Sequence, residues 1–302
     1  MPHLIEKLTK NGLIKPPSWM PHNCHYLTVM GSRAYACERP NSDFDVYGFA
    51  IPPRDMVFRH LAGEIEGFGQ QTKLFEVWDQ AHHIIDPNDG QEYGFSIYSI
   101  VKYFQLCMDG NPNMIDSLFT ANNCVLHITS VGQMVRDNRK LFLSKRCFHT
   151  FRGYAFKQIK KLKTKTPKKG SVRHADVEEH GFDTKYAYHL VRLISEAEQI
   201  LQLGNVDLQR DNEIYKSVRR GDWTEKKLLA YFDEKDPYLT KLYEESTIPH
   251  EPDEQKIKTL LLSCLEHHYG SLDKCVVLPD AATLALRQIQ AILDQNHKLL
   301  NS

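Results

Sequence analysis

The chain has 302 residues, 41% of them hydrophobic and 25% charged, and its 38 basic residues balance its 38 acidic residues. This length suits one large domain or two modest ones, and the composition is ordinary for a globular protein with a buried core. Because the formal net charge is zero, charge can indicate a partner only where it clusters. The N-terminal sequence lacks the pattern of a signal peptide, and no run of about 18 apolar residues predicts a membrane span.

The seven cysteines are scattered along the chain and include no C-x-x-C pair. This pattern argues against a zinc site and favours free thiols in a reducing compartment. We therefore expect a cytoplasmic protein that does not associate with membranes. The sequence leaves the oligomeric state open.

The chain up to about residue 98 has the pattern of strands and turns. Residues 25–31 form a short apolar run that ends in a glycine, which is typical of a core strand. Residues 43–51 alternate in character, so Asp43 and Asp45 are expected on one face of a second strand. Two later strand-like runs flank an Asp-Gly pair, which predicts a hairpin.

From residue 97 onward the spacing of apolar residues becomes helical. Residues 97–108 predict an amphipathic helix, and Pro112 stands just ahead of a second one. The coarse picture is a small α/β head followed by a long helical body. Further helices are predicted at 130–143, 183–203, 225–245, 254–268 and 279–299.

A Gly-Ser turn and an Asp-x-Asp pair are the motifs that indicate chemistry. Gly31 and Ser32 end the first predicted strand, where the glycine lets the backbone approach a ligand and the serine hydroxyl can bind phosphate. Asp43 and Asp45 project in parallel, as the close carboxylates that Mg²⁺ prefers when it carries a triphosphate. Each motif alone is usually an ordinary exposed segment, but this order and spacing predict one ligand site.

The segment from Gly31 to Pro53 resembles the signature of the DNA polymerase β nucleotidyltransferases. More narrowly, it is similar to the predicted nucleotidyltransferases found beside RNA ligases in bacterial and phage genomes. The similarity covers most of the chain, which makes it more specific than the two motifs alone. It continues through IYSIVKYFQLCMDGNPNMIDSLF, MVRDNRKLFLSKR, FRGYAFKQIKK and KYAYHLVRLISEAEQIL.

The resemblance implies an α+β fold. A small mixed-sheet catalytic head of the polymerase β type would span residues 1–108, and a mostly helical domain would span residues 109–302. It also implies that Asp43 and Asp45 bind Mg²⁺, or alternatively Mn²⁺, and that a third acid comes from a neighbouring strand.

The position of this third acid departs from the family pattern. Register with the IYSIVKYF block puts it at position 94, which is Gly94 in this chain. Glu92 shares a strand face with that position and is the best substitute, whereas Asp86 and Asp89 belong to the turn. If no acid fills the place, nucleotide binding is expected to survive and catalysis is not.

Three basic side chains in the predicted helix at 183–203 have the spacing of one helical face: Lys185, His189 and Arg192. Facing the head, they would neutralise the β- and γ-phosphates, and the resemblance of this block favours that interpretation. The alternative is a solvated face paired with nearby acids. Arg33, just after the Gly-Ser turn, is a weaker candidate for the same role.

Residues 157–173 concentrate basic side chains, and the Thr, Pro, Gly and Ser residues among them predict a mobile loop. A basic loop suits the phosphates of RNA, and a solvated loop with no partner is an equal alternative. The candidate RNA-binding residues are Lys160, Lys161, Lys163 and Lys165.

The sequence thus predicts an enzyme that transfers a nucleoside monophosphate from a nucleoside triphosphate to a hydroxyl, with an RNA end as the expected acceptor, and releases pyrophosphate. A protein or small-molecule hydroxyl is an enzymatic alternative. A catalytically impaired nucleotide or RNA sensor is the alternative from another class, and Gly94 favours it. The predicted catalytic and metal-binding residues are Asp43, Asp45 and Glu92, and the predicted nucleotide-binding residues are Gly31, Ser32, Arg33, Lys185, His189 and Arg192.

Overall fold

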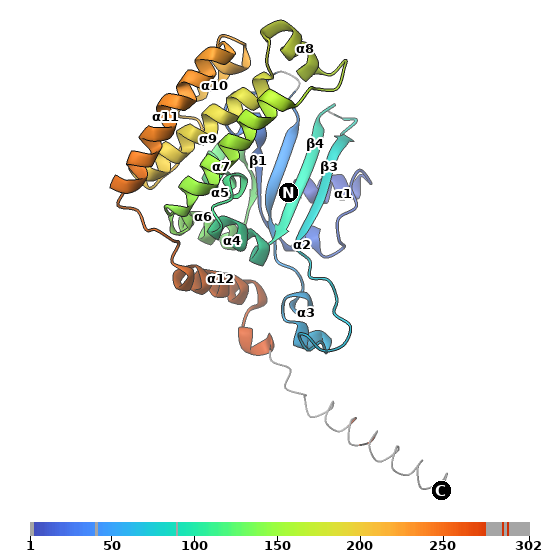
Figure 1. The fold of residues 1–302 in the computed structure, drawn as a ribbon. Helices are drawn as coiled ribbons and strands as arrows, with labels where there is room; N and C mark the ends of the chain where they lie inside the picture. Colours follow the sequence, from blue (N-terminus) through green and yellow to red (C-terminus); the bar gives the residue numbers. More distant parts are fainter. Residues whose placement is uncertain (1–2, 40–41, 89, 276–285, 287–288, 290–302) are drawn as a thin grey trace. The chain divides into compact units, whose positions relative to one another are not determined.

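A computed structural model describes residues 3–39, 42–88, 90–275, 286 and 289 (Figure 1). The chain forms two compact units, residues 1–52 with 75–268 and residues 53–74 with 269–302. The second unit contains α3 (Arg54–Val57) and two short 3-10 helices, η2 (Arg59–Ala62) and η5 (Leu272–Cys275). The helix predicted at 279–299 lies outside the described residues, apart from 286 and 289.

A five-stranded mixed sheet with the order β3-β4-β2-β1-β5 forms the centre of the first unit. β2 is antiparallel to β1 and parallel to β4, and the outer strands β3 and β5 are antiparallel to their neighbours. The predicted α+β class is confirmed, and the sheet takes its last strand from beyond residue 108. The strands are β1 (Cys24–Met30), β2 (Phe44–Ala50), β3 (Val77–Ile85), β4 (Glu92–Ser99) and β5 (Val125–Ile128).

The predicted hairpin is formed by β3 and β4. The Asp86 backbone closes its turn, donating to Gln91 O at 3.0 Å and accepting from Gly90 N at 2.8 Å. The Asp86 side chain is fully buried and accepts from Asn88 N at 3.0 Å and from Lys7 Nζ at 3.2 Å. Asp86 therefore serves the turn, as its sequence position predicts.

Helices surround the sheet, and α4, α5, α7 and α9 lie on the face opposite to α1 and α2 (Figure 1). The helices predicted at 183–203, 225–245 and 254–268 are confirmed, whereas the one at 130–143 ends early and continues as the 3-10 helix η4 (Arg139–Phe142). The helices of this unit are α1 (Leu4–Lys10), α2 (Met20–Asn23), α4 (Ile100–Met108), α5 (Pro112–Phe119), α6 (Ser130–Asp137), α7 (Arg146–Thr164), α8 (Val172–His180), α9 (Thr184–Leu203), α10 (Asn212–Arg219), α11 (Glu225–Glu245) and α12 (Glu254–Tyr269).

Two boundary predictions are wrong. The helix expected from residue 97 begins at Ile100, because β4 continues to Ser99 and the Ser99 side chain caps α4 by accepting from Lys102 N at 3.2 Å. The loop expected over residues 157–173 is helical at both ends, where α7 runs to Thr164 and α8 starts at Val172. Basic residues are good helix formers, so their density did not indicate a loop.

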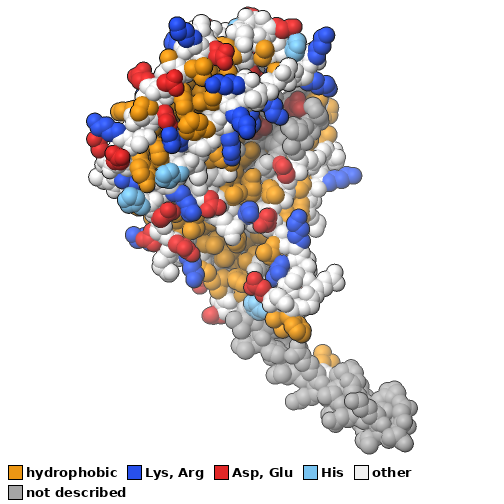
Figure 2. All heavy atoms as spheres, in the orientation of Figure 1, with side chains coloured by type: hydrophobic (Ala, Val, Ile, Leu, Met, Phe, Trp, Pro, Cys, Tyr) orange, Lys and Arg blue, Asp and Glu red, His pale blue; other side chains and the backbone are white. Residues whose placement is uncertain are grey.

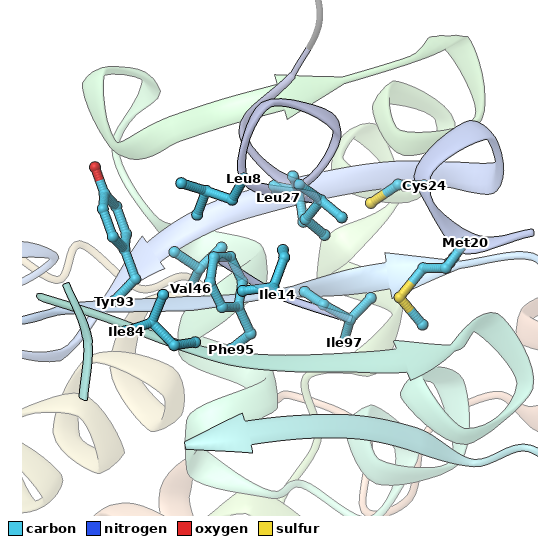
Figure 3. Close-up of a cluster of buried hydrophobic side chains, with 12 residues drawn as sticks. Leu8, Ile14, Met20, Cys24, Leu27, Val46, Ile84, Tyr93, Phe95 and Ile97 are labelled. Carbon is cyan, nitrogen blue, oxygen red and sulfur yellow. The ribbon is translucent and has the colours of Figure 1, made fainter. Parts of the chain in front are cut away.

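Both faces of the sheet are packed, one against the N-terminal segment and the other against α4 and α5. Ile5, Leu8, Ile14 and Met20 from the N-terminal segment belong to a buried cluster with residues of β1, β2, β3 and β4, including Val46 (Figure 3). Burying each such aliphatic side chain contributes roughly 1.5–3 kcal/mol. Because side chains alternate along a strand, the neighbours of Val46 project from the opposite face, toward α5 and α9.

Among the described residues, no helix combines the length and the apolar character that crossing a lipid bilayer requires.

Candidate active site

The Gly-Ser turn is the short 3-10 helix η1 (Gly31–Arg33), which follows β1 directly. Gly31 has a φ of +67°, in the left-handed region that favours glycine. A Cβ at this position would lie 2.6 Å from Oδ2 of Asp45, so that carboxylate would have to shift to make room. The backbone conformation therefore favours glycine, and any larger residue would also make the Asp45 carboxylate shift.

The start of the Asp-x-Asp segment is fixed by hydrogen bonds to Ser42. Its hydroxyl accepts from the Arg39 backbone N at 2.9 Å and from Ser32 Oγ at 3.2 Å. Its carbonyl accepts from the Arg33 guanidinium at 2.8 Å, and that guanidinium lies 3.9 Å above the centre of the Phe44 ring. Arg33 thus holds the segment that carries the aspartates.

A pocket of about 200 Å³, the central pocket, lies between this segment and α9. It brings Gly31 and Ser32 together with Asp43 and Asp45, and with the three predicted basic residues of α9. Of the predicted nucleotide-binding residues, Arg33 alone is not among those that line it. Its lining also includes three side chains that the sequence did not indicate: Asn113, Tyr188 and Arg219.

The rim of the central pocket is cationic. Lys185 is exposed, and Arg219 from α10 donates to the Cys37 carbonyl at 2.8 Å with its guanidinium 5.1 Å from the centre of the Tyr188 ring. Within the described part of the chain, neither Lys185 nor Arg219 has a carboxylate at ion-pair distance. Both charges are therefore available to an anion.

The His189 imidazole lies among these cations. Burial lowers its pKa well below the usual value, and the nearby charges of Arg192, Lys185, Arg219 and Arg173 lower it further. The ring is therefore neutral at neutral pH, and an anion placed beside it would raise its pKa.

Arg192 forms the floor of the pocket and differs from the rim. It is 3% exposed, donates to Glu196 Oε2 at 2.8 Å, and contacts the buried Asp116 carboxylate, which also accepts from Tyr35 at 2.7 Å. Burial raises the pKa of both carboxyl groups. The sequence predicted three cations in a row, but the charge of Arg192 is already matched by these two acids.

A second hollow of about 230 Å³, the acidic pocket, lies on the other side of the aspartates along β4. Asp43, Asp45 and Tyr47 line both pockets. The acidic pocket also contains Glu92 and Asp79, and Asp79 accepts from Ser96 Oγ at 2.8 Å. Four carboxylates therefore line it.

Gly94 lies in register with Asp45, and a Cβ there would be 3.6 Å from Asp45 Oδ1. An acid at this position would therefore meet the aspartate pair directly. Glu92 stands two residues away on the same strand face, and Asp79 stands on the next strand. Within the described residues, no three His, Cys, Asp or Glu side chains are grouped so that they could hold a metal ion.

The two aspartates fit Mg²⁺ without a third protein ligand. Mg²⁺ is commonly bound through one or two carboxylates together with substrate phosphates and water. Asp43 and Asp45 supply carboxylate oxygens at the border of the two pockets, beside the Gly-Ser turn where phosphate would lie.

Asp79 and Arg219 are the candidate residues that the sequence analysis missed. The hairpin gave a signal for Asp79, because continuing the Ile85–Glu92 pairing along both strands puts residue 79 on the face of residues 94 and 96. A register shift within β3 moves its partner but preserves that face. No local pattern indicated Arg219, which reaches the pocket from a helix far along the chain.

Comparisons with known proteins find similar sequences. A family model described as RNA repair pathway DNA polymerase beta family matches residues 14–217. An uncharacterized 38.9 kDa protein from the nrdC–mobD intergenic region of Enterobacteria phage T4 is 25% identical over 149 residues, which are 48% of this chain and 40% of the phage protein. The chain thus matches less than half the length of that relative. No solved structure matches.

The matched residues include the Gly-Ser turn, the aspartate pair, β4 and the basic residues of α9, and they make up more than half of the chain. This chain belongs to the RNA repair pathway DNA polymerase beta family.

Proposed function

We propose that this protein is a Mg²⁺-dependent nucleotidyltransferase that transfers a nucleoside monophosphate from a nucleoside triphosphate to a hydroxyl, with an RNA end as the acceptor. The observation that carries the proposal is the position of Asp43 and Asp45 at the border of a cationic pocket and an acidic one. A phosphate bound there has neutralising cations on one side and carboxylates able to accept a proton on the other.

The donor triphosphate fits the central pocket. The backbone of η1 and the Ser32 hydroxyl offer hydrogen-bond donors at its base, and Lys185 and Arg219 offer positive charge at its rim. Charge-assisted hydrogen bonds of this kind are the strong ones in phosphate recognition. Arg33 contributes by fixing the Ser42 carbonyl and thereby the aspartate pair.

The reaction joins the acceptor oxygen to the α-phosphorus and breaks the bond from that phosphorus to the oxygen bridging to the β-phosphate. The electron pair of that bond leaves with pyrophosphate, and the hydroxyl proton passes to a carboxylate of the acidic pocket, for which Glu92 is the first candidate. Bound Mg²⁺, or alternatively Mn²⁺, would neutralise developing charge on the phosphates and lower the pKa of the acceptor hydroxyl.

Exposed lysines near the site support RNA as the acceptor. Figure 2 shows Lys and Arg side chains gathered over the part of α7 nearest to α8. The candidates Lys160, Lys161 and Lys163 belong to α7, and Lys165 follows at its end. Clustered positive charge of this kind binds the phosphates of nucleic acid, and the family description names RNA repair.

The test is pyrophosphate release from each of the four nucleoside triphosphates, with Mg²⁺ or Mn²⁺ and with or without RNA. Wild type is expected to release pyrophosphate, and the Asp43→Asn/Asp45→Asn variant to lose release by about a hundredfold or more, because these two carboxylates would hold the metal ion. Asp233→Asn, an exposed change on α11, is the matched control and should retain full activity. Equal release by wild type and the double variant would refute the proposal.

Gly94 favours a second candidate, a nucleotide sensor without transfer activity. In that case nucleoside triphosphate binds with Mg²⁺ and no pyrophosphate appears under any condition. Gly94→Asp, which restores an acid in register with Asp45, would then create activity. Release by the wild type excludes this candidate.

A further inference from the structure

A third hollow of about 280 Å³, the distal pocket, lies among α7, α8 and α9. It shares Asn113, Lys185, His189 and Arg192 with the central pocket and no residue with the acidic pocket. The three hollows therefore follow one another in the order acidic, central and distal, with the aspartates at the first border and Lys185 at the second.

The distal pocket is the cationic end of this series. Lys157, Lys161 and Arg173 line it in addition to the shared Lys185, and no Asp or Glu is among its lining residues. Arg173 is partly matched by the neighbouring Asp183, to which its Nε donates at 2.9 Å. Within the described residues Lys157 and Lys161 have no carboxylate at ion-pair distance, so their charges are available.

The pocket is also built rather than being a loose cluster of surface lysines. Lys157 Nζ lies 4.7 Å from the centre of the Tyr154 ring, which holds the ammonium group by a cation–π contact. The Arg173 guanidinium and Lys161 Nζ lie 4.1 and 5.6 Å from the centre of the Tyr186 ring. At the border with the central pocket, the buried Arg192 has an Nε with no hydrogen-bond partner among the described residues.

The geometry of the transfer reaction indicates which way the donor points along the acidic, central and distal pockets. In phosphoryl and nucleotidyl transfer the attacking and leaving oxygens lie roughly in line on opposite sides of the phosphorus. With the α-phosphate at the aspartates and the other phosphates against Lys185, the acceptor hydroxyl approaches from the acidic pocket. The leaving group therefore points toward the distal pocket.

We propose that the distal pocket binds condensed phosphate, either the pyrophosphate that leaves the donor or a phosphate chain that extends beyond the γ-phosphate. This inference rests on the proposed function for the direction in which the donor lies. The charge, the aromatic supports and the border with the central pocket all suit a compact polyanion. Of the four lysines proposed for RNA, Lys160, Lys163 and Lys165 do not line the pocket, and Lys161 is the one that the two sites share.

Binding of inorganic pyrophosphate and of tripolyphosphate to the full chain, measured by calorimetry, tests the proposal. Lys157→Ala/Lys161→Ala is expected to weaken both by about tenfold or more, because two charge-assisted contacts are lost. Lys160→Ala/Lys163→Ala removes the same charge from the same helix outside the pocket and is expected to change binding less than about twofold. Equal effects of the two double variants, or no binding by the wild type, would overturn the proposal.

Two further ligands distinguish the sources of the phosphate. A nucleoside tetraphosphate that loses more affinity than the triphosphate in Lys157→Ala/Lys161→Ala would assign the pocket to an extended donor. Equal loss of affinity for the two nucleotides, or none for either, together with weakened pyrophosphate binding, would assign it to the leaving group. An RNA oligonucleotide that competes with pyrophosphate in wild type, and loses affinity only in this variant, would show a nucleic-acid site instead and overturn the proposal.

The binding assay also separates this inference from the proposed function. Asp43→Asn/Asp45→Asn is expected to abolish pyrophosphate release and leave pyrophosphate binding in the distal pocket within about threefold, since neither aspartate lines that pocket. Absence of release in the wild type with intact binding would refute transfer activity and retain the anion site.

Discussion

The two sides of the aspartate pair differ in charge although they share Asp43, Asp45 and Tyr47. On the sheet side, Glu92 and Asp79 bring the number of carboxylates in the acidic pocket to four, with no Lys or Arg in its lining. On the helical side, cations line the central and distal pockets. In the proposed reaction, the sheet would therefore supply groups for the attacking hydroxyl, and the helices would supply groups for the departing phosphates.

Among the variants that test this difference between the two sides, Gly31→Ala is expected to have the largest effect on turnover. The change lies beside Asp45, at the border of the central and acidic pockets. The new Cβ would overlap Oδ2 of Asp45 and would require a left-handed backbone that alanine adopts at a cost of about 1 kcal/mol. Displacing a catalytic group by about 1 Å costs on the order of a hundredfold in rate. Turnover is measured as pyrophosphate release and is expected to fall by about that factor.

Gly153→Ala is the control for this change. Gly153 lies within α7, where a Cβ would meet open space, so alanine should stabilise the helix by about 0.5–1 kcal/mol and leave turnover unchanged. If Gly31→Ala keeps wild-type turnover, the close contact with Asp45 has no part in the reaction.

A smaller loss of turnover is expected from Glu92→Gln, which tests which carboxylate of the acidic pocket accepts the proton. Glu92 is on β4, the strand paired directly with β2, whereas Asp79 is one strand farther away and accepts from Ser96. A general base contributes about 10²–10⁴-fold to the reaction rate. Because the loss of Glu92 would be partly compensated, turnover is expected to fall by roughly tenfold to a hundredfold.

Asp79→Asn is the matched variant, and it should change turnover by less than about threefold if Asp79 only holds Ser96. The reverse order of the two effects would assign the third carboxylate to β3. Thermal unfolding of both variants checks that the sheet is intact.

The smallest effect is expected from Arg219→Ala on the helical side. Loss of one unpaired cation should raise the KM for the nucleoside triphosphate by about tenfold with little change in kcat, since the contact is made to bound substrate throughout the reaction. The neighbouring Arg220 pairs with Asp222 at 2.7 Å on the surface, so Arg220→Ala should leave KM unchanged. Equal KM values for both variants would remove Arg219 from the donor site.

The fold was predictable where the pattern is local. The apolar run before Gly31, the alternation around Asp45 and the Asp-Gly turn predicted β1, β2 and the β3–β4 hairpin. The start of α4 was misplaced, because Ile97 suits either a buried strand or a helix and the serine cap at Ser99 decides between them. The lysines of α7 were taken for a loop because charge density hid their helix propensity.

The motifs of the site could be predicted from the sequence, but the pairing of its charged side chains could not. Helical spacing placed Lys185, His189 and Arg192 beside one pocket. The same spacing does not show that Arg192 is matched by Asp116, which comes from another helix. Arg219 was missed for the same reason, since contacts between distant segments depend on how the helices pack.

The buried Asp116–Arg192–Glu196 cluster affects how the molecule responds to ionic strength. Two acids already face the Arg192 guanidinium at the floor of the central pocket, so the floor attracts phosphate only weakly. The attraction for phosphate comes from the cations at the rim. At the rim, Lys185 is exposed and Arg219 is half-buried, and in solvent dissolved ions screen charge over about 8 Å at physiological salt. The sensitivity of phosphate affinity to salt is therefore expected to come from these exposed cations, because the buried ion pairs of the pocket floor are screened much less.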